Sequence, residues 1–156
     1  MTTWFSAANT SADGRALALI RMTLGAMFVW VFFHNYATGA YTAAGYARVI
    51  EYFLKKAHPP EAWKAVMSLI AANAALAAPV QATGEIALGA LLALGLLTRP
   101  AAIVAALFLA SLWVSELGTG WVWELLLPTV CAFALALGRA GHTWGVDGLL
   151  ARRRAI

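Results

Sequence analysis

Four stretches of this chain are apolar over lengths close to those needed to cross a bilayer as helices, and no other feature restricts the fold as strongly. They cover residues 16–37, 79–97, 100–117 and 121–138. The first would rise about 33 Å as a helix, against a hydrocarbon core of about 30 Å, and the other three lie at the short end of the spanning range. The first is also too long for the apolar core of a secretory signal peptide. We therefore predict an all-α fold, an integral-membrane four-helix bundle forming a single domain over residues 1–156.

The composition also indicates a lipid environment. Hydrophobic residues make up 62% of the chain and charged residues only 12%, about half the charged share of a soluble domain. This excludes a disordered chain, which needs low hydrophobicity and high charge. The lone Cys131 excludes a disulfide scaffold and is expected to be a packing residue. The net charge of +4 comes from basic residues at the ends of apolar runs, a pattern of membrane topology and not of nucleic-acid binding.

Residues 38–78, between the first and second predicted spans, carry charged side chains among aromatic residues and alanines. The segment YARVIEYFLKK places Val49, Phe53 and Lys56 on one side of a helix and Glu51 and Lys55 on another. Such a separation is typical of a helix that lies at the membrane interface. We therefore predict a long amphipathic helical loop between the first two spans.

This loop is expected to contain a break. The prolines of His58–Pro60 end a helix because proline lacks the backbone donor and clashes with the preceding turn. A second helix is expected to start at Glu61. Residues 65–78 are apolar but include polar side chains, so they fit an interfacial segment, a re-entrant segment or an extension of the second span.

The basic residues predict the orientation of the chain. Seven of its 11 positive residues fall on or near one side when both termini are cytoplasmic: Arg15, Arg21, Arg99, Arg139 and Arg152–Arg154. The positive-inside rule therefore favours cytoplasmic termini. Three tryptophans then gather at the outer interface, where amphipathic rings are favoured: Trp113, Trp121 and Trp123.

Two charged residues lie well inside predicted spans, where a charge costs at least about 2.5–3.5 kcal/mol on insertion scales. Each begins a stripe of residues whose equal spacing places them on one helix face. The stripes are Arg21, Gly25, Phe28, Phe32 and Asn35 on the first span, and Glu85, Gly89, Leu92, Leu96 and Arg99 on the second. The glycines would let another helix approach closely. We predict that both stripes face the interior of the bundle.

Helix rise places Glu85 in the outer half of the bundle, at about the level of Glu124, His34 and Asn35. A carboxyl group buried there is expected to be protonated or hydrogen-bonded. Such a group suits a proton relay or a partner for a quinone carbonyl. His34 also fits a polar interface residue without a catalytic role.

Arg21 is predicted to lie deeper, roughly 14 Å from Glu85 along the helix axis. A direct bond between the two is therefore too long, and we expect Arg21 to bond helix carbonyls or to reach toward the inner surface. Arg21 and Arg99 fit a role in helix packing as well as a role in binding.

Several cofactor motifs are missing from the sequence. No CxxC or CxxCH occurs, so we expect neither an iron–sulfur cluster nor a c-type haem. His34 and His142 lie near opposite ends of the predicted bundle, so the histidines do not offer two axial ligands to one haem. No phosphate-binding glycine loop or GxSxG is present, and no metal site is expected.

Three segments carry a resemblance to a known family. GEIALGALLALGLLTRPAA, residues 84–102, resembles the DoxX/DoxD family of small four-span membrane proteins through Glu85, Gly89, Gly95, Thr98 and Arg99. RMTLGAMF resembles its first-helix pattern through Arg21, Gly25 and Phe28, and GRAGHTWGVDGLL its tail through Gly138, Trp144 and Asp147. The chain departs from the pattern at Phe32 and at His34–Asn35, where the family usually has a glycine and a lysine.

The resemblance implies a redox setting in the bacterial cytoplasmic (inner) membrane. Some members resemble the membrane subunit of a thiosulfate:quinone oxidoreductase, and others are linked to sulfur or thiol oxidation. On this hypothesis the chain would bind a quinone and work with a membrane or extracytoplasmic redox partner. Glu85, Glu124 and His34 would act catalytically, and Arg21, Arg99 and Asn35 would bind the cofactor. The alternative is a non-catalytic accessory subunit that packs against a larger membrane complex; a transporter or channel is weaker, because no span carries a polar stripe.

Overall fold

The computed structural model describes residues 12–153, and these residues form seven helices and no strand. The helices are α1 (Ala12–Ala37), α2 (Ala43–Lys56), α3 (Glu61–Ala72), α4 (Ala74–Leu94), α5 (Thr98–Ser115), α6 (Val122–Leu137) and α7 (Val146–Arg153). The predicted all-α fold is therefore confirmed over the described part of the chain.

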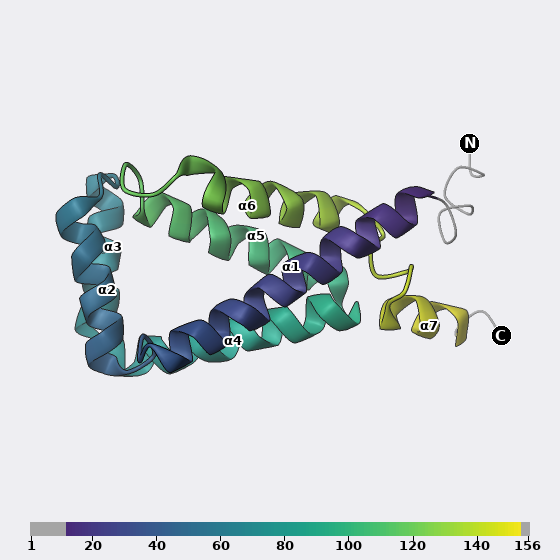
Figure 1. Cartoon of the computed structure of the whole chain (residues 1–156), viewed down its shortest axis with the longest axis horizontal. Coiled ribbons are helices and arrows are strands. Elements are labelled where there is room, and N and C mark those ends of the chain that lie inside the picture. The colour runs from purple at the N-terminus through teal and green to yellow at the C-terminus, as the bar shows by residue number, and fades with distance from the viewer. Residues whose placement is uncertain (1–11, 154–156) are drawn as a thin grey trace.

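Four of the helices pack as two antiparallel pairs, α1 with α4 and α5 with α6 (Figure 1). Contacts between α1 and α6 and between α4 and α5 join the pairs. The pairs diverge toward one end, where α2 and α3 lie across them (Figure 1). The short helix α7 lies at the opposite end, near the beginning of α1.

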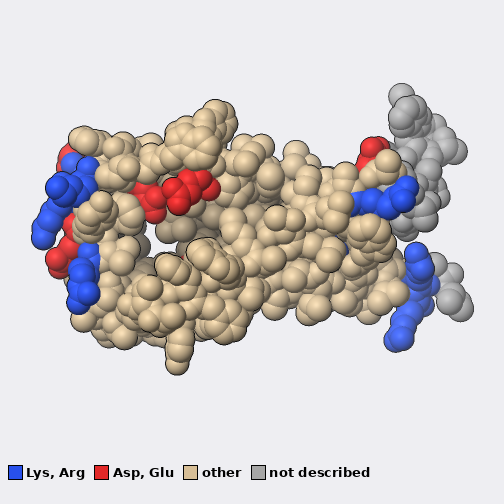
Figure 2. Space-filling model, in the orientation of Figure 1, with Lys and Arg blue, Asp and Glu red and all other residues tan. Residues whose placement is uncertain are grey.

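Three helices, α1, α4 and α5, are long and apolar enough to cross a membrane. Helix α6 is apolar but has only 16 residues, about 24 Å of helix. Lysine and arginine side chains gather at the two ends of the molecule, and the surface between them shows few charges apart from a group of acidic side chains nearer one end (Figure 2). This distribution is typical of a membrane protein, while the predicted fourth crossing stays a prediction.

The segment that connects α1 to α4 is divided into helices at two points, first at the prolines that follow α2 and again at Asn73. The side chain of Thr42 accepts a hydrogen bond from the backbone N–H of Gly45 and caps α2. The expected proline break separates α2 from α3. Residues 65–78, for which the sequence left three alternatives, belong partly to α3 and partly to α4, with the boundary at Asn73.

Helix α4 begins and ends earlier than the predicted span. It begins at Ala74 and accommodates Pro79 within its length. It ends at Leu94 because Gly95 takes a left-handed conformation, with φ of 67°, and this conformation favours glycine. The predicted stripe on this helix is therefore wrong in its last part: Leu96 and Arg99 lie beyond the helix end.

The first parts of both predicted stripes do face the interior. Arg21, Gly25 and Phe28 of α1 are buried, as are Glu85 and Gly89 of α4. The two glycines are in contact: a Cβ added at Gly25 would lie 2.9 Å from the carbonyl oxygen of Gly89. As predicted, these glycines let α1 and α4 approach closely.

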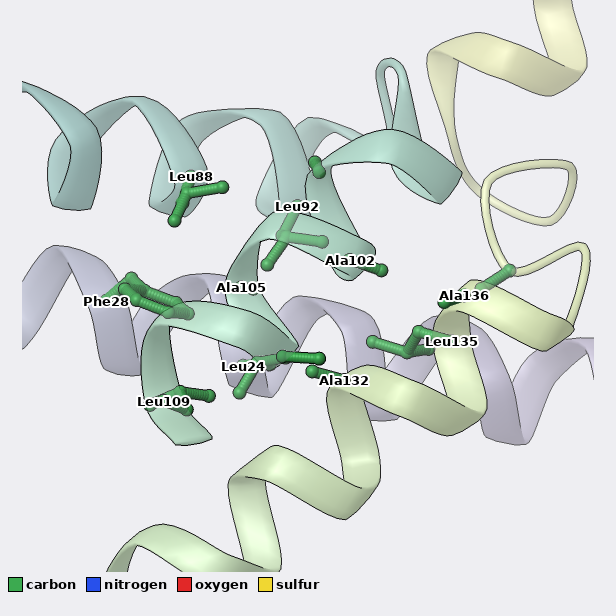
Figure 3. Packing of buried hydrophobic residues seen from close by; sticks show 13 residues of the cluster. Leu24, Phe28, Leu88, Leu92, Ala102, Ala105, Leu109, Ala132, Leu135 and Ala136 are labelled. Atoms are coloured by element: carbon green, nitrogen blue, oxygen red, sulfur yellow. The ribbon is translucent and has the colours of Figure 1, made fainter. Parts of the chain in front are cut away.

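The apolar core lies between the helix pairs, toward the end that carries α7. Leucine and phenylalanine side chains from α1 and α4 meet mainly alanines from α5 and α6, together with Leu109 and Leu135 (Figure 3). They include Leu24, Phe28, Leu88, Leu92, Ala102, Ala105, Ala132 and Leu135. Because this core fills only one part of the space between the diverging pairs, the part next to α2 and α3 remains hollow.

Candidate functional site

A hydrogen-bonded polar cluster surrounds Glu85, whose side chain is only 2% exposed. Gln81 Nε2 donates to Glu85 Oε1 over 2.7 Å. The hydroxyl of Tyr41 and Asn35 Nδ2 both donate to Glu85 Oε2. Tyr46 extends the cluster by donating its hydroxyl to Gln81 Oε1 over 2.6 Å. We call Glu85 and these four residues the Glu85 cluster.

Local structure explains how these residues meet. Gln81 lies one helical turn before Glu85 on α4, so both side chains are on one face. Asn35 is in the last turn of α1, Tyr41 is in the turn that follows, and Tyr46 is on α2. The tight turn after α1 therefore brings Tyr41 to the carboxyl group of Glu85 and Tyr46 to the amide of Gln81.

The two tyrosines remain hydrogen-bond donors over the physiological pH range. Burial raises the pKa of Tyr41 well above its ordinary value, and the hydrogen bond to Glu85 raises it further. Burial also raises the pKa of Tyr46, with an additional contribution from the charge of Glu85. Both hydroxyls thus keep their protons and hold the carboxyl group of Glu85 and the amide of Gln81 in place.

A cavity of about 570 Å³ lies against this cluster, between the helix pairs and next to α2 and α3. Figure 2 shows a hollow in this part of the surface, with acidic side chains beside it. Its walls are mainly apolar side chains of α1, α2, α3 and α5: Val31, Val49, Ile50, Phe53, Met67, Ile70, Phe108 and Leu112. Its volume lies within the range of small-molecule sites, which are mostly apolar with a few placed polar groups.

Two further carboxyl groups, Glu116 and Glu124, line the same cavity. Glu116 follows the last residue of α5, and Glu124 lies in the first turn of α6. The turn between these helices places both side chains near Gly120. Burial raises the pKa of Glu116, and the negative charge of Glu124 raises it further.

The Glu116→Gln substitution is expected to stabilise the chain near neutral pH. In the folded chain the pKa of Glu116 is raised above its ordinary value of 4.5. Below pH 4.5 Glu116 therefore stabilises the native state, and this stabilisation is lost as the pH rises through the pKa that Glu116 has in the folded chain. The melting temperature of the variant should therefore exceed that of the wild type by about 2 °C near pH 7. The difference should shrink toward pH 4.5. Glu51→Gln, at an exposed position of α2, is the matched control, and a pH-independent difference between Glu116→Gln and the wild type would contradict the assignment.

The structure brings three predicted site residues to one place and leaves three elsewhere. Glu85, Glu124 and Asn35 all line the cavity. His34 lies on the exposed side of α1, stacked on Trp30 with ring centroids 5.1 Å apart. The side chain of His34 is therefore separate from the Glu85 cluster, although the residue lies at the depth along α1 that helix rise predicts. The two arginines are at the other end of the molecule.

Arg21 and Arg99 contact backbone carbonyl groups. Arg21 is fully buried and donates to the carbonyl oxygens of Leu92 and Ala93, over 2.7 and 3.1 Å, and of Trp144, over 3.0 Å. The prediction that it bonds helix carbonyls is confirmed. Arg99 is exposed, and its Nε donates to the carbonyl oxygen of Ala136 over 3.0 Å.

Four residues of the site were not selected from the sequence. Gln81 carries a usable signal, because it lies four residues before Glu85 on the same helix face. Tyr41 and Tyr46 are in the interfacial loop, where no periodicity links them to Glu85. Glu116 is at a helix end, where a charged residue is usually solvated. Within the described residues, no group of three or more His, Cys, Asp or Glu side chains could hold a metal ion.

Comparisons with known proteins point to one family. No curated protein and no solved structure matches the chain. The family model described as DoxX matches residues 16–116, from the first turns of α1 to Glu116. The match includes the loop before α4, which the resemblance noted in the sequence did not cover, and it ends before α6 and the tail. Because it spans more than half of the sequence, this chain is a membrane protein that belongs to the DoxX family.

Proposed function

We propose that this chain is a subunit of a quinone-linked redox complex and that it binds a quinone head group in the cavity beside Glu85. The observation that carries the proposal is a buried carboxyl group, held by Tyr41, Asn35 and Gln81, in the wall of a mainly apolar cavity of about 570 Å³. An apolar ring with two carbonyl acceptors needs such surroundings: apolar walls and a few fixed donors.

The residues of the cluster fit this group. When bound, a quinone supplies reversible transfer of two electrons and two protons. The second N–H of the Gln81 amide is the donor that would orient a carbonyl oxygen, and the hydroxyl of Tyr46 lines the same wall of the cavity. Glu85 would hold a proton next to that oxygen. The aliphatic and aromatic walls would keep water away from the ring.

Glu116 and Glu124 give the cavity a second place to hold protons. They lie at the α5–α6 turn, toward the end of the molecule where charged residues reappear (Figure 2). A proton from the aqueous side would reach this pair before it reaches Glu85. We assign to the pair the exchange of protons between the cavity and the solvent.

We also propose a redox partner and a membrane orientation for the chain. Quinone chemistry needs an electron donor, and we assign it to a partner subunit that oxidises a sulfur compound or a thiol. We place the chain in the bacterial inner membrane, with α6 as a fourth crossing and both termini in the cytoplasm. The excess of arginine at the α7 end supports this orientation.

Glu85→Gln is expected to weaken quinone binding by about tenfold, because its amide nitrogen would face donor groups that now bond the carboxyl group and would disturb the cluster. The measurement is calorimetric titration of the full chain in nanodiscs with a short-chain ubiquinone analogue, comparing wild type, Glu85→Gln and Tyr41→Phe. Glu51→Gln, an exposed residue of α2, is the matched control. Thermal unfolding of each variant shows that the fold is retained.

Two outcomes would contradict the proposal. Equal affinity in the wild type and Glu85→Gln would remove Glu85 from the site. Isolation of the chain in fixed stoichiometry with a larger membrane complex, without quinone bound and with turnover unchanged in Glu85→Gln, would identify it as a non-catalytic accessory subunit.

A further inference from the structure

The end of the molecule that carries α7 has a surface on which apolar and basic side chains lie together. Trp144 and Leu149 are 61% and 60% exposed, and Leu94 is 58% exposed. Arg152 and Arg153, at the end of α7, are exposed as well. Exposed tryptophan and leucine beside arginine are the side chains that occupy the boundary between lipid tails and head groups.

The chain holds this surface firmly in place. Asp147 accepts hydrogen bonds from the backbone N–H groups of Leu97 and Thr98, both over 2.9 Å. Arg21 donates to the carbonyl oxygen of Trp144 over 3.0 Å. Trp144 itself has a φ of 50°, which is uncommon for a residue other than glycine and needs support from its surroundings. Buried contacts thus fix the backbone of a residue whose indole ring is exposed.

A hollow of about 330 Å³ lies within this surface. Its walls combine Leu94 and Leu149 with the ring of Trp144, and its polar groups include His142 and Arg152. An apolar wall next to a guanidinium group suits an amphipathic ligand with an anionic head. We call these five residues the tail surface.

The two ends of the molecule differ in charge. Among the described residues, the α7 end carries six arginines against Asp13 and Asp147: the buried Arg21 and, in addition, Arg15, Arg99, Arg139, Arg152 and Arg153. The carboxylate of Asp147 faces inward, because it accepts the two backbone hydrogen bonds. At the α2–α3 end, Arg48, Lys55, Lys56 and Lys64 are balanced by Glu51, Glu61, Glu116 and Glu124. Only the α7 end therefore attracts an anionic membrane surface.

We propose that the tail surface binds an anionic phospholipid of the leaflet next to α7. Arg152, with His142, contacts the phosphate, while Trp144, Leu94 and Leu149 contact the first carbons of the acyl chains. Arg153 adds charge to the same surface. The site is separate from the cavity at Glu85 and does not depend on its function.

The test is native mass spectrometry of the full chain in detergent, titrated with phosphatidylglycerol or with phosphatidylcholine. Phosphatidylglycerol is expected to bind at least tenfold more tightly. Each basic residue near an anionic surface contributes about fivefold in affinity, so the Arg152→Gln, Arg153→Gln double variant should bind it about thirtyfold more weakly. The matched control is Lys55→Gln with Lys56→Gln, which removes two charges from the opposite end and should change the affinity less than threefold.

A second pair of variants tests the apolar part of the site. Trp144→Ala should weaken retention of phosphatidylglycerol at least threefold, whereas Trp121→Ala, an exposed tryptophan near the other end, should not. Equal losses in both double variants would show general charge attraction and overturn the proposal. So would equal binding of the two lipids, or displacement of the lipid by inorganic phosphate at similar concentration, which would indicate a phosphate site.

Discussion

Replacing Arg21 with methionine is expected to lower the free energy of unfolding by about 3–5 kcal/mol, the range seen when one partner of a buried charged contact is removed. Methionine keeps an unbranched apolar side chain in place of the aliphatic part of arginine but has no donor. The carbonyl groups of Leu92 and Ala93 at the end of α4, and of Thr143 and Trp144 in the tail, would lose a buried donor. Each unpaired buried acceptor costs about 1–3 kcal/mol.

The measurement is thermal unfolding of the full chain in detergent, where the melting temperature should fall by about 10 °C or more. Protease sensitivity of the tail should rise as well, because one guanidinium group joins α1, the end of α4 and the tail. Arg21→Lys should restore only part of the loss, since an ammonium group lacks the fork of the guanidinium group. Arg99→Met is the control: its exposed guanidinium donates one hydrogen bond to Ala136, which is worth about 1 kcal/mol. Equal effects at the two arginines would contradict the assigned role of Arg21.

The charged residues inside the predicted spans could be placed from the sequence because lipid leaves them few alternatives. A guanidinium or carboxyl group within a span must face the protein interior, and helix periodicity then places the residues four and seven positions further along. The buried positions of Arg21, Gly25 and Phe28, and those of Glu85 and Gly89, follow from these two conditions. The residues beyond Leu94 do not follow from them, because a glycine within an apolar run does not by itself reveal a left-handed residue that ends the helix.

The partners of Glu85 follow from tertiary structure, which periodicity does not report. Tyr41 reaches the carboxyl group because a short turn after α1 reverses the chain. Tyr46 reaches Gln81, which in turn donates to Glu85, because α2 packs against α4. Helix rise predicts how deep His34 lies along α1, but it does not predict the direction in which the side chain points. It lies at the end of the same helix as Asn35, but on a face that points away from the cavity.

Gly25→Ala is expected to separate α1 from α4 and to destabilise the chain by about 1–3 kcal/mol, the usual effect of overpacking a closely packed site. A Cβ at this position would lie 2.5 Å from the backbone nitrogen of Ala93 and 2.9 Å from the carbonyl oxygen of Gly89. Both are backbone atoms and cannot move aside without moving α4. The shift should also reach Arg21, one turn away, whose acceptors include the carbonyl group of Ala93.

Gly84→Ala is the matched control, because a Cβ at Gly84 of α4 meets no atom within 4 Å. Alanine is the better helix former by about 1 kcal/mol, so this substitution should raise the melting temperature in the same detergent assay. The two substitutions add the same methyl group to neighbouring helices and should act in opposite directions. If Gly25→Ala stabilised the chain as Gly84→Ala does, the close contact between α1 and α4, and with it the position of Arg21 against the end of α4, would be wrong.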